Sequence, residues 1–373
     1  MGATGTVQLA VALDGTGWHP SSWREPDARP TELLTARYWT DLILEAERGR
    51  LDFVTIEDAL ALQSGSGVHG RLDAVLIAAR VGPVTRHIGL VPTVITTHTE
   101  PFHTSKAIAT LDFVTSGRAG VRVKVAADAE SAAHFGRREV SQIDLLGEAA
   151  DYVEVLRRLW DSWEDDAEIR DVATGRFIDR TKLHYIDFES ATFSVKGPSI
   201  TPRPPQGQPI VAALGHTSPA LRLIANSADV GFITPLDAAE TARTVEAVAA
   251  RRPDTVGPVR LFADLVVFLD DSPQAARARK QRLDDLTGTD YRSDAEVFVG
   301  SPGELADLVV ARSSSGVAGF RLRPATLPHD LLQITRGLMP ELQRRGAVRG
   351  GYHASTLRGL LGLARPANRY ANT

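Results

Sequence analysis

Short runs of apolar residues alternate along the chain with segments whose apolar residues recur every three or four positions. The run 210–214 contains no polar residue, as expected for a strand that is covered on both faces. The segment 144–163 places leucine, valine and aromatic residues along one stripe of a helix. This alternation recurs along the chain and predicts strands at 7–13, 51–56, 87–94, 118–125, 210–214, 230–234, 259–269 and 319–322.

Helical periods follow these strands. The predicted helices are 31–48, 71–81, 102–114, 144–163, 218–226, 236–251, 273–286, 302–313 and 327–345. Eight consecutive strand–helix pairs predict an α/β fold, a single (β/α)8 TIM barrel that spans residues 1–373. The segments 164–209 and 287–300 lack a regular period, and we interpret them as insertions after strand four and before strand eight.

Composition narrows the classes of function. The formal net charge of −4 over 373 residues provides no broad basic surface for nucleic acid or anionic lipid. The absence of cysteine excludes disulfides and thiolate chemistry, and the ten histidines show no metal-ligand spacing, so no metal site is expected. The first residues do not resemble a signal peptide, and no apolar run has the length of a membrane span. We therefore expect a cytoplasmic enzyme that acts on a small molecule.

Several polar residues fall at the carboxyl ends of predicted strands, where barrel enzymes carry their chemistry. Asp58 is suited to accept a hydrogen bond from a ring N–H of a bound heterocycle, or to cap the next loop. Thr93 offers a hydroxyl to a polar ring edge, or is simply a β-branched residue in a strand. Arg122 and Lys124 lie on the fourth strand, where we expect at least one of them to face the barrel mouth, or one of them to point into the helix layer and pair with an acid.

Two loops add further candidates. Gly215, His216, Thr217 and Ser218 join the fifth strand to a helix, and backbone N–H groups at a helix start are suited to hold a phosphate. Thr217 or Ser218 also suits a helix N-cap, which explains the same residues without a ligand. His19 follows the first strand and is a candidate catalytic acid or base, with a packed or solvated loop histidine as the alternative.

Longer motifs carry a resemblance to a known family. The tail 339–369 reads MPELQRRGAVRGGYHASTLRGLLGLARPANR, residues 51–58 read LDFVTIED, and residues 88–120 read IGLVPTVITTHTEPFHTSKAIATLDFVTSGRAG. These motifs and the ALGHTS turn resemble the bacterial luciferase-like flavin-dependent monooxygenases. Within that family they resemble the branch of nitrilotriacetate, dibenzothiophene-sulfone and pristinamycin-type two-component enzymes. The resemblance covers nearly the whole chain, including the tail 339–373.

The resemblance implies a barrel that binds FMN at the carboxyl ends of its strands. The flavin would arrive as FMNH2 from a separate NAD(P)H:flavin reductase and react with O2, and one oxygen atom would enter a small organic substrate. Asp58 would hold the pyrimidine edge of the flavin, Thr93 would line the ring, and the turn from Gly215 to Ser218 would bind the phosphate. The segment 164–209 would cover the site, and the chain would form a homodimer or tetramer.

The chain also departs from the family pattern. Where the family shows a Trp-Asn pair, a Thr-Ser pair and an Arg-Tyr pair, this sequence has Val121, Arg122, Val125, Ala126, Leu145 and Leu146. We expect Arg122 to replace a lost cofactor contact. Two alternatives stay open: a relative that uses another reduced flavin such as a deazaflavin, and a non-catalytic subunit that pairs with an active homologue.

Overall fold

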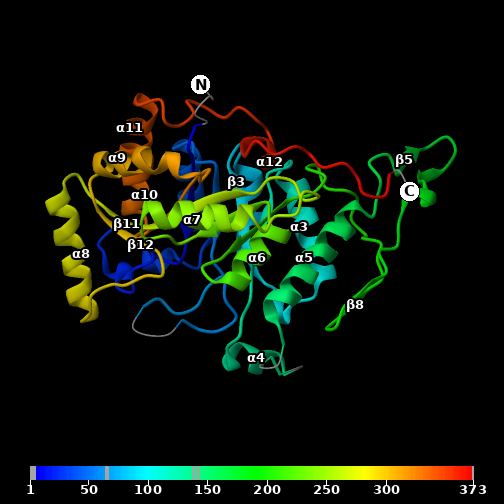
Figure 1. Cartoon of the computed structure of the whole chain (residues 1–373), viewed down its shortest axis with the longest axis horizontal. Coiled ribbons are helices and arrows are strands. Elements are labelled where there is room, and N and C mark those ends of the chain that lie inside the picture. The colour runs from blue at the N-terminus through cyan, green and yellow to red at the C-terminus, as the bar shows by residue number, and fades with distance from the viewer. Residues whose placement is uncertain (1–5, 64–66, 137–138, 141–142, 372–373) are drawn as a thin grey trace.

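The computed structural model describes residues 6–63, 67–136, 139–140 and 143–371, and it contains a closed barrel of parallel strands surrounded by helices (Figure 1). Neighbouring strands follow the order β10-β9-β4-β3-β2-β1-β13-β11, and β10 pairs with β11 to close the ring. The predicted TIM barrel is therefore confirmed. Its strands are β1 (Gln8–Leu13), β2 (Phe53–Ile56), β3 (Gly89–Ile95), β4 (Gly120–Lys124), β9 (Ile210–Leu214), β10 (Val230–Ile233), β11 (Arg260–Leu269) and β13 (Gly319–Pro324).

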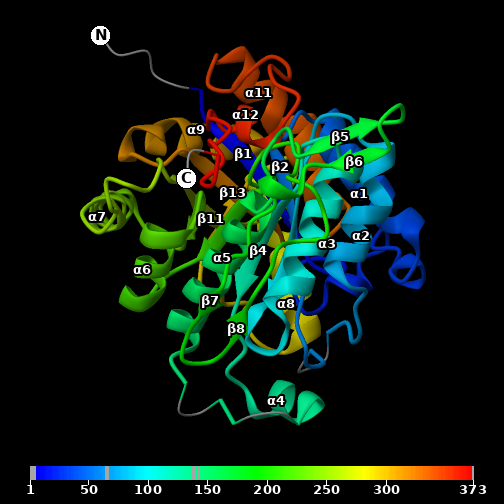
Figure 2. The ribbon, with the colours of Figure 1, turned by 90° about the vertical axis from the view of Figure 1, so that its right-hand side faces the viewer.

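Helices cover the outside of the barrel (Figure 2). Many begin at a side-chain cap, and Ser301 and Glu304 form a reciprocal capping box at the start of α9. The helices are α1 (Ala36–Arg48), α2 (Ala74–Val81), α3 (Pro101–Val114), α4 (Ala129–Phe135), α5 (Leu145–Asp161), α6 (Ser218–Ser227), α7 (Ala238–Ala249), α8 (Pro273–Thr287) and α9 (Pro302–Arg312), followed by a last helix made of α10 (His329–Gln333), the π-helical η7 (Ile334–Leu338) and α11 (Met339–Arg344).

The first helix is shorter than the apolar pattern predicts. It begins at Ala36 instead of near residue 31, because the side chain of Thr35 caps it by accepting a hydrogen bond from the backbone N–H of Tyr38. Pro30–Glu32 forms a separate 3-10 turn. The helical period of the sequence continued through this turn and so gave no sign of the break.

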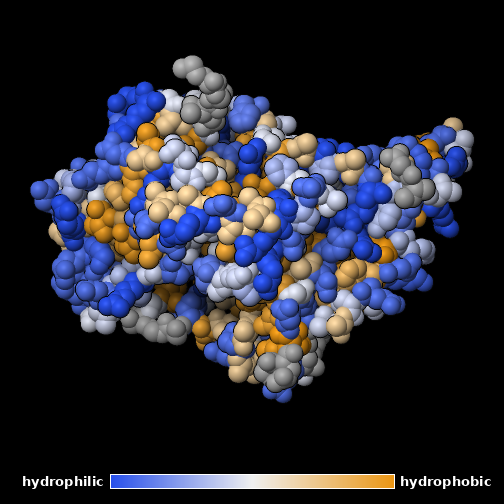
Figure 3. Space-filling view, viewed as in Figure 1, coloured by the Kyte–Doolittle hydropathy of each residue, from blue (hydrophilic) through white to orange (hydrophobic). Residues whose placement is uncertain are grey.

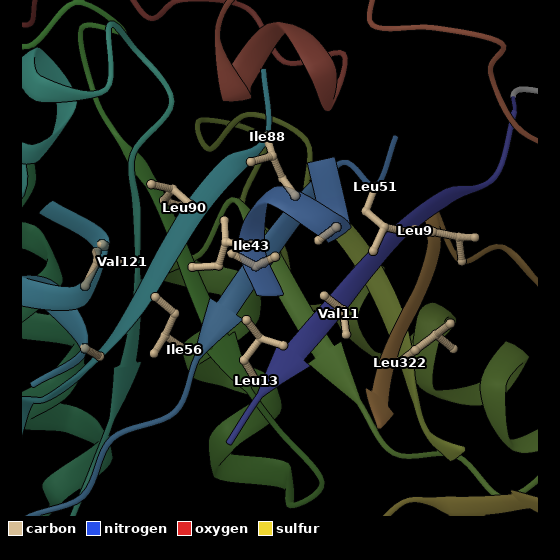
Figure 4. Packing of buried hydrophobic residues seen from close by; sticks show 14 of the residues in the cluster. Leu9, Val11, Leu13, Ile43, Leu51, Ile56, Ile88, Leu90, Val121 and Leu322 are labelled. Carbon is tan, nitrogen blue, oxygen red and sulfur yellow. The ribbon is translucent and has the colours of Figure 1, made fainter. Parts of the chain in front are cut away.

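Alternation along each strand divides the core into two layers. Outward-facing strand residues pack against the helices, as Val11 of β1 and Ile43 of α1 do (Figure 4). Inward-facing residues at the amino ends of the strands form a second apolar cluster inside the barrel, which includes Phe53, Phe232 and Phe262. Burial of both layers supplies the main driving force for folding.

The C-terminal tail closes the amino end of the barrel. The short helix α12 (Leu357–Leu360) inserts Leu357 into the inner apolar cluster. A Cβ on Gly89 would lie 2.5 Å from Leu357 Cδ1, so this approach requires glycine at the start of β3. Arg358 anchors the tail by donating from Nη2 to Asp229 Oδ1 at 2.8 Å. The tail is thus part of the barrel core.

The segment 287–300, which we expected to be irregular, contains a ninth strand of the sheet, β12 (Glu296–Gly300). β12 pairs with the second half of β11, where Leu265 aligns with Glu296. β10 pairs with the first half of β11, where Val230 aligns with Arg260. β13 occupies the other edge of β11, so β10 and β12 share the remaining edge. The pairing of β10 is therefore limited to the first half of β11.

The segment 164–209 forms two small hairpins, β5 (Glu168–Asp171) with β6 (Arg176–Ile178) and β7 (Phe188–Glu189) with β8 (Ser194–Val195). The first hairpin lies at the end of the molecule that also holds α12, whereas β8 lies toward α4 (Figures 1 and 2). Arg203 in the same segment donates a hydrogen bond to the carbonyl of Pro366 in the tail. The first hairpin and Arg203 therefore lie at the amino end of the barrel. Thr192 and Phe193 of the second hairpin instead line a pocket with Thr96 and Thr97 just after β3, at the carboxyl end, so the cover expected from this segment stays a prediction.

Polar and apolar residues are interspersed over the face drawn in Figure 3. Among the helices that the structure describes, none combines the length and the apolar character needed to cross a membrane.

Replacing Leu357 by alanine should lower the free energy of unfolding by about 2–5 kcal/mol, because the side chain is fully buried in the barrel floor. Urea denaturation measures this change. Leu34→Ala is the matched control, since its side chain is 62% exposed and its loss should change stability by less than about 0.5 kcal/mol. Equal effects of the two substitutions would contradict the assignment of the tail to the core.

Candidate active site

A network of buried charges fills the middle of the barrel. Asp264 of β11 accepts hydrogen bonds from Arg321 Nε at 2.8 Å and from Arg323 Nε at 2.9 Å, both on the neighbouring strand β13. The three side chains are almost completely inaccessible to solvent. The guanidinium of Arg321 also lies 3.8 Å from the ring centroid of Phe232, in a cation–π contact with the apolar layer below. Asp294 completes the group by accepting a hydrogen bond from Arg323 Nη1 at 2.6 Å.

A second ion pair crosses the barrel above β3. Arg122 of β4 donates from Nη1 to Glu57 Oε2 at 2.5 Å and to Thr93 Oγ1 at 3.3 Å. Glu57 directly follows β2, and both charged side chains are about 95% buried. Burial alone would raise the pKa of Glu57, but the charges of Arg122 and Arg321 outweigh it and bring the pKa to about 2. Glu57 is therefore a carboxylate at neutral pH.

The same pair retains unused hydrogen-bonding groups. Within the described residues, Arg122 Nε and Glu57 Oε1 are buried and have no hydrogen-bond partner. Arg321 Nη1 approaches Glu57 Oε1 at 3.5 Å, too far for a normal hydrogen bond. Buried polar atoms without partners are rare in folded proteins, and a ligand is one way to satisfy them.

Sequence reasoning selected Asp58 and missed Glu57. Phe53 and Thr55 face the barrel interior, so the strand period of two places Glu57 inside and Asp58 outside. Asp58 accepts hydrogen bonds from the backbone N–H of Ala59 at 2.8 Å and of Ala74 at 3.0 Å, at the start of α2. This is the loop-capping arrangement that the sequence left open for Asp58, and burial raises its pKa. The alternation of inward and outward residues along β2 was the sequence signal that would have pointed to Glu57.

His19 lies apart from this network, on the side of α8. Its Nε2 is 3.1 Å from Asp284 Oδ1, and its Nδ1 accepts a hydrogen bond from the backbone N–H of Ser21 at 3.0 Å. Because Nδ1 accepts, the proton of the neutral ring belongs on Nε2, where it is donated to Asp284. Burial lowers the pKa of His19 more than Asp284 raises it. This arrangement favours a role in holding the first loop, and a catalytic role for His19 stays a prediction.

The predicted phosphate turn lies at the end of β9. Gly215 is buried, and a Cβ there would lie 2.9 Å from Ile224 Cδ1 and 3.0 Å from the carbonyl carbon of Ala220, so glycine lets α6 pack close to the strand. His216, Thr217 and Ser218 are exposed. Thr217 is the N-cap of α6, but its side chain makes no capping hydrogen bond. The first turn of α6 therefore offers backbone N–H groups to an anion.

The structure brings only some of the predicted residues together. Thr93 and Arg122 are in contact, and Lys124 Nζ links β4 to the loop after β2 by donating to the carbonyl of Asp58 at 3.1 Å. β9, which leads to the phosphate turn, pairs directly with β4. No group of three or more potential metal ligands occurs in the described part of the chain.

The residues at which this chain departs from the family pattern lie on different faces of the barrel wall. Val121 is buried in the layer between strands and helices, and Val125 packs against the same layer. Leu146 also packs there, at the start of α5. Arg122 is instead directed into the barrel by its contact with Glu57. Arg122 is thus the departure that changes the chemistry of the barrel interior most directly.

Comparison with known proteins identifies the relatives of the chain. Residues 18–319 match the family described as luciferase-like monooxygenase. The chain is 30% identical to N-acetyl-S-(2-succino)cysteine monooxygenase of Bacillus subtilis (strain 168) over 98% of each protein. It is 30% identical to nitrilotriacetate monooxygenase component A of Aminobacter aminovorans over 100% of this chain and 99% of that protein. A crystal structure of riboflavin lyase with modified FMN superposes with a TM-score of 0.86 at 24% identity, covering 98% of both chains.

Replacing Asp264 by asparagine should lower the free energy of unfolding by about 3–5 kcal/mol, because it leaves two buried guanidinium groups without their shared carboxylate. Chemical denaturation at neutral pH tests this. Asp254→Asn removes an exposed carboxylate and should change stability by less than about 0.5 kcal/mol. A loss below about 1 kcal/mol for Asp264→Asn would contradict a tightly coupled network.

Protonation of His19 should be disfavoured in the folded state, because burial holds its pKa below the ordinary value of 6.5. The unfolded chain then binds more protons below pH 6.5, so the stability that His19 contributes is present at pH 7.5 and decreases as the pH falls below 6.5. In urea denaturation, the stability difference between the wild type and His19→Gln should shrink from pH 7.5 to pH 5.5. A difference that grows instead would mean that Asp284 holds His19 in its charged form.

Proposed function

The chain belongs to the luciferase-like monooxygenase family and is an oxidoreductase, and from this premise we propose that it is the oxygenating component of a two-component monooxygenase. It would use FMNH2 and O2 to insert one oxygen atom into a small organic substrate. The second component would be a separate NAD(P)H:flavin reductase that supplies FMNH2. The observation that supports this proposal most directly is the start of α6, where no side chain caps the helix. It lies beside a barrel interior that contains buried polar atoms without hydrogen-bond partners.

The phosphate end of the proposed site is suited to FMN. Gly215 brings α6 close to β9, and the exposed residues His216, Thr217 and Ser218 leave the first helical turn accessible. Backbone N–H groups and the positive end of the helix dipole favour a phosphate there. These four residues support the assignment of the phosphate site, although Pro219 removes one N–H from the turn.

The ring end of the proposed site uses Asp58, Thr93 and Arg122. Each oxygen of the Asp58 carboxylate already accepts one backbone N–H and retains a lone pair for a ring N–H. Arg122 has a buried Nε without a partner in the described part of the chain, and its second terminal nitrogen makes no hydrogen bond with described residues. A carbonyl of the flavin ring would satisfy these donors, so the donor set fits the group.

Each component of the proposed reaction has a defined task. Bound FMNH2 would supply two electrons, so that one atom of O2 enters the substrate and the other leaves as water. The protein residues would hold the ring and the phosphate and keep bulk water from the ring. His19 stays a candidate acid or base, which would require its bond to Asp284 to open.

We also propose self-association as a homodimer or tetramer. Leu72 and Leu76 line an apolar groove of about 190 Å³ between α1 and α2, and the side chain of Leu76 is 69% exposed. Exposed apolar surface of this kind is typical of protein–protein contacts. A cytoplasmic location stays a prediction.

Anaerobic titration tests the cofactor directly. FMN reduced in the absence of oxygen should bind the purified chain, and admission of air with a substrate should give a product heavier by one oxygen atom in mass spectrometry. Binding of a reduced deazaflavin in place of FMNH2 would favour the alternative cofactor. Absence of flavin binding, together with co-purification of a homologue, would favour a non-catalytic subunit.

Replacing Thr217 by aspartate should weaken the binding of FMNH2 at least about tenfold, because a carboxylate at the start of α6 repels the phosphate and competes for the same N–H groups. Thermal stability should stay unchanged or rise, since aspartate is a favourable N-cap. Thr217→Asn is the matched control, with nearly the same shape and capping ability but no charge. Equal affinities of the two variants would remove the phosphate from this turn.

A further inference from the structure

A groove of about 840 Å³ lies at the amino end of the barrel, opposite the candidate active site. Its wall includes Gln8 at the start of β1, Arg260 at the start of β11 and Ala318 just before β13. The C-terminal part of α7 and the helix α12 also contribute to it (Figure 1). This volume is typical of clefts that hold small molecules, and the lining includes none of the residues assigned to the flavin.

Backbone carbonyls fix the guanidinium groups of two arginines in this groove. Arg252 donates from Nε to the carbonyl of Gly257 at 2.5 Å and from Nη1 to the carbonyl of Ala225 at 2.9 Å, near the end of α6. Arg260 donates from Nε to the carbonyl of Leu361 at 2.9 Å. In the described part of the chain, Arg252 Nη2 and Arg260 Nη1 make no hydrogen bond. Each guanidinium group is thus held in place and keeps one terminal nitrogen for a ligand.

The charge of these two arginines is not neutralised within the groove. Neither arginine forms an ion pair with a described carboxylate, and burial lowers the pKa of Arg252. The carboxylate of Asp229 opposes this shift only in part, since Arg157 and Arg358 already form ion pairs with it. Among the described residues of the lining, Asp254 is the one carboxylate. With the lining histidine neutral, two positive charges and one negative charge leave a net charge of +1, which favours an anion.

Aliphatic side chains form another part of the groove wall. They belong to α7, to the loop before β11, to the residue pair before β13 and to the end of α12, and they are Val245, Val248, Val256, Val317 and Leu361. The described lining contains no Phe, Tyr or Trp that could stack on an aromatic ligand. The groove therefore suits an anion that carries an aliphatic part.

We propose that this groove binds an amphipathic anion, whose carboxylate or phosphate group contacts Arg252 and Arg260 and whose aliphatic part lies against the valine side chains. The planar fork of an arginine matches both kinds of anionic group. Because Arg260 also holds the carbonyls of Leu361 and Gly362, the bound anion would strengthen the attachment of α12 to the start of β11.

This ligand would be an effector of stability and not a substrate, because barrel enzymes carry their chemistry at the opposite end of the strands. The inference goes beyond the proposed function and does not depend on it.

Isothermal titration with octanoate and with octyl phosphate, each below the concentration at which it forms micelles, tests the groove. At least one of them should bind with one-to-one stoichiometry and raise the Tm, because it binds the folded chain. Neutral 1-octanol should not bind. Acetate and inorganic phosphate carry the same anionic groups without the aliphatic part and should bind at least about tenfold more weakly. Failure of both amphipathic anions to bind, or equal affinity of 1-octanol or of the short anions, would overturn the inference.

Substitutions at Val256 locate the bound anion. Val256→Asp places a carboxylate in the groove, next to the Gly257 carbonyl that holds Arg252, and should weaken the binding at least about tenfold by repulsion. Val256→Asn is the matched control, with nearly the same shape and no charge, and should keep the wild-type affinity. Arg260→Met should also weaken the binding, and the Val256 pair decides the case if this variant does not fold. Equal affinities of Val256→Asp and Val256→Asn would place the ligand elsewhere and overturn the inference.

Discussion

Mutual neutralisation of buried charges is the constraint on which this barrel depends. A closed ring of strands excludes water from its interior, so each charged side chain there needs an opposite charge and hydrogen bonds. Asp264 meets this need for both Arg321 and Arg323, and Glu57 does so for Arg122. These pairs join the neighbouring strands β11 and β13, and they join β2 to β4 across the intervening β3, so the electrostatic contacts tie together strands on two sides of the ring.

The same constraint shapes the candidate site. Among the described residues, Arg122, Glu57 and Arg71 each retain a buried side-chain atom without a hydrogen-bond partner. They lie where β2 and β4 end, beside the turn that leads into α6. Chemistry in this fold is expected at that end of the strands. The apolar layer and the Asp264 network fill the lower part of the interior, and the upper part retains polar atoms without partners.

Much of the fold could be predicted from the sequence, because strands buried on both faces give apolar runs that few other structures give. The eight barrel strands and their order follow from that signal. β12 was missed because its short sequence pairs with only half of β11, and α1 was overextended because a capped turn continued the helical period. For the candidate site, the sequence predicted that the polar residues lie at the carboxyl ends of the strands. The choice between Glu57 and Asp58 depends on which way one residue faces, and Asp284, the side-chain partner of His19, is 265 positions away on α8.

The closure of the barrel floor by α12 affects how the protein is made. Leu357 and Leu361 complete an apolar cluster whose other members, such as Phe53 and Phe262, are synthesised much earlier. While α12 is still inside the ribosomal exit tunnel, that end of the ring stays open to water and its phenylalanines are exposed to other proteins. The nascent chain thus carries an incomplete core until α12 has emerged and docked, a stage at which chaperones that shield apolar surface would act.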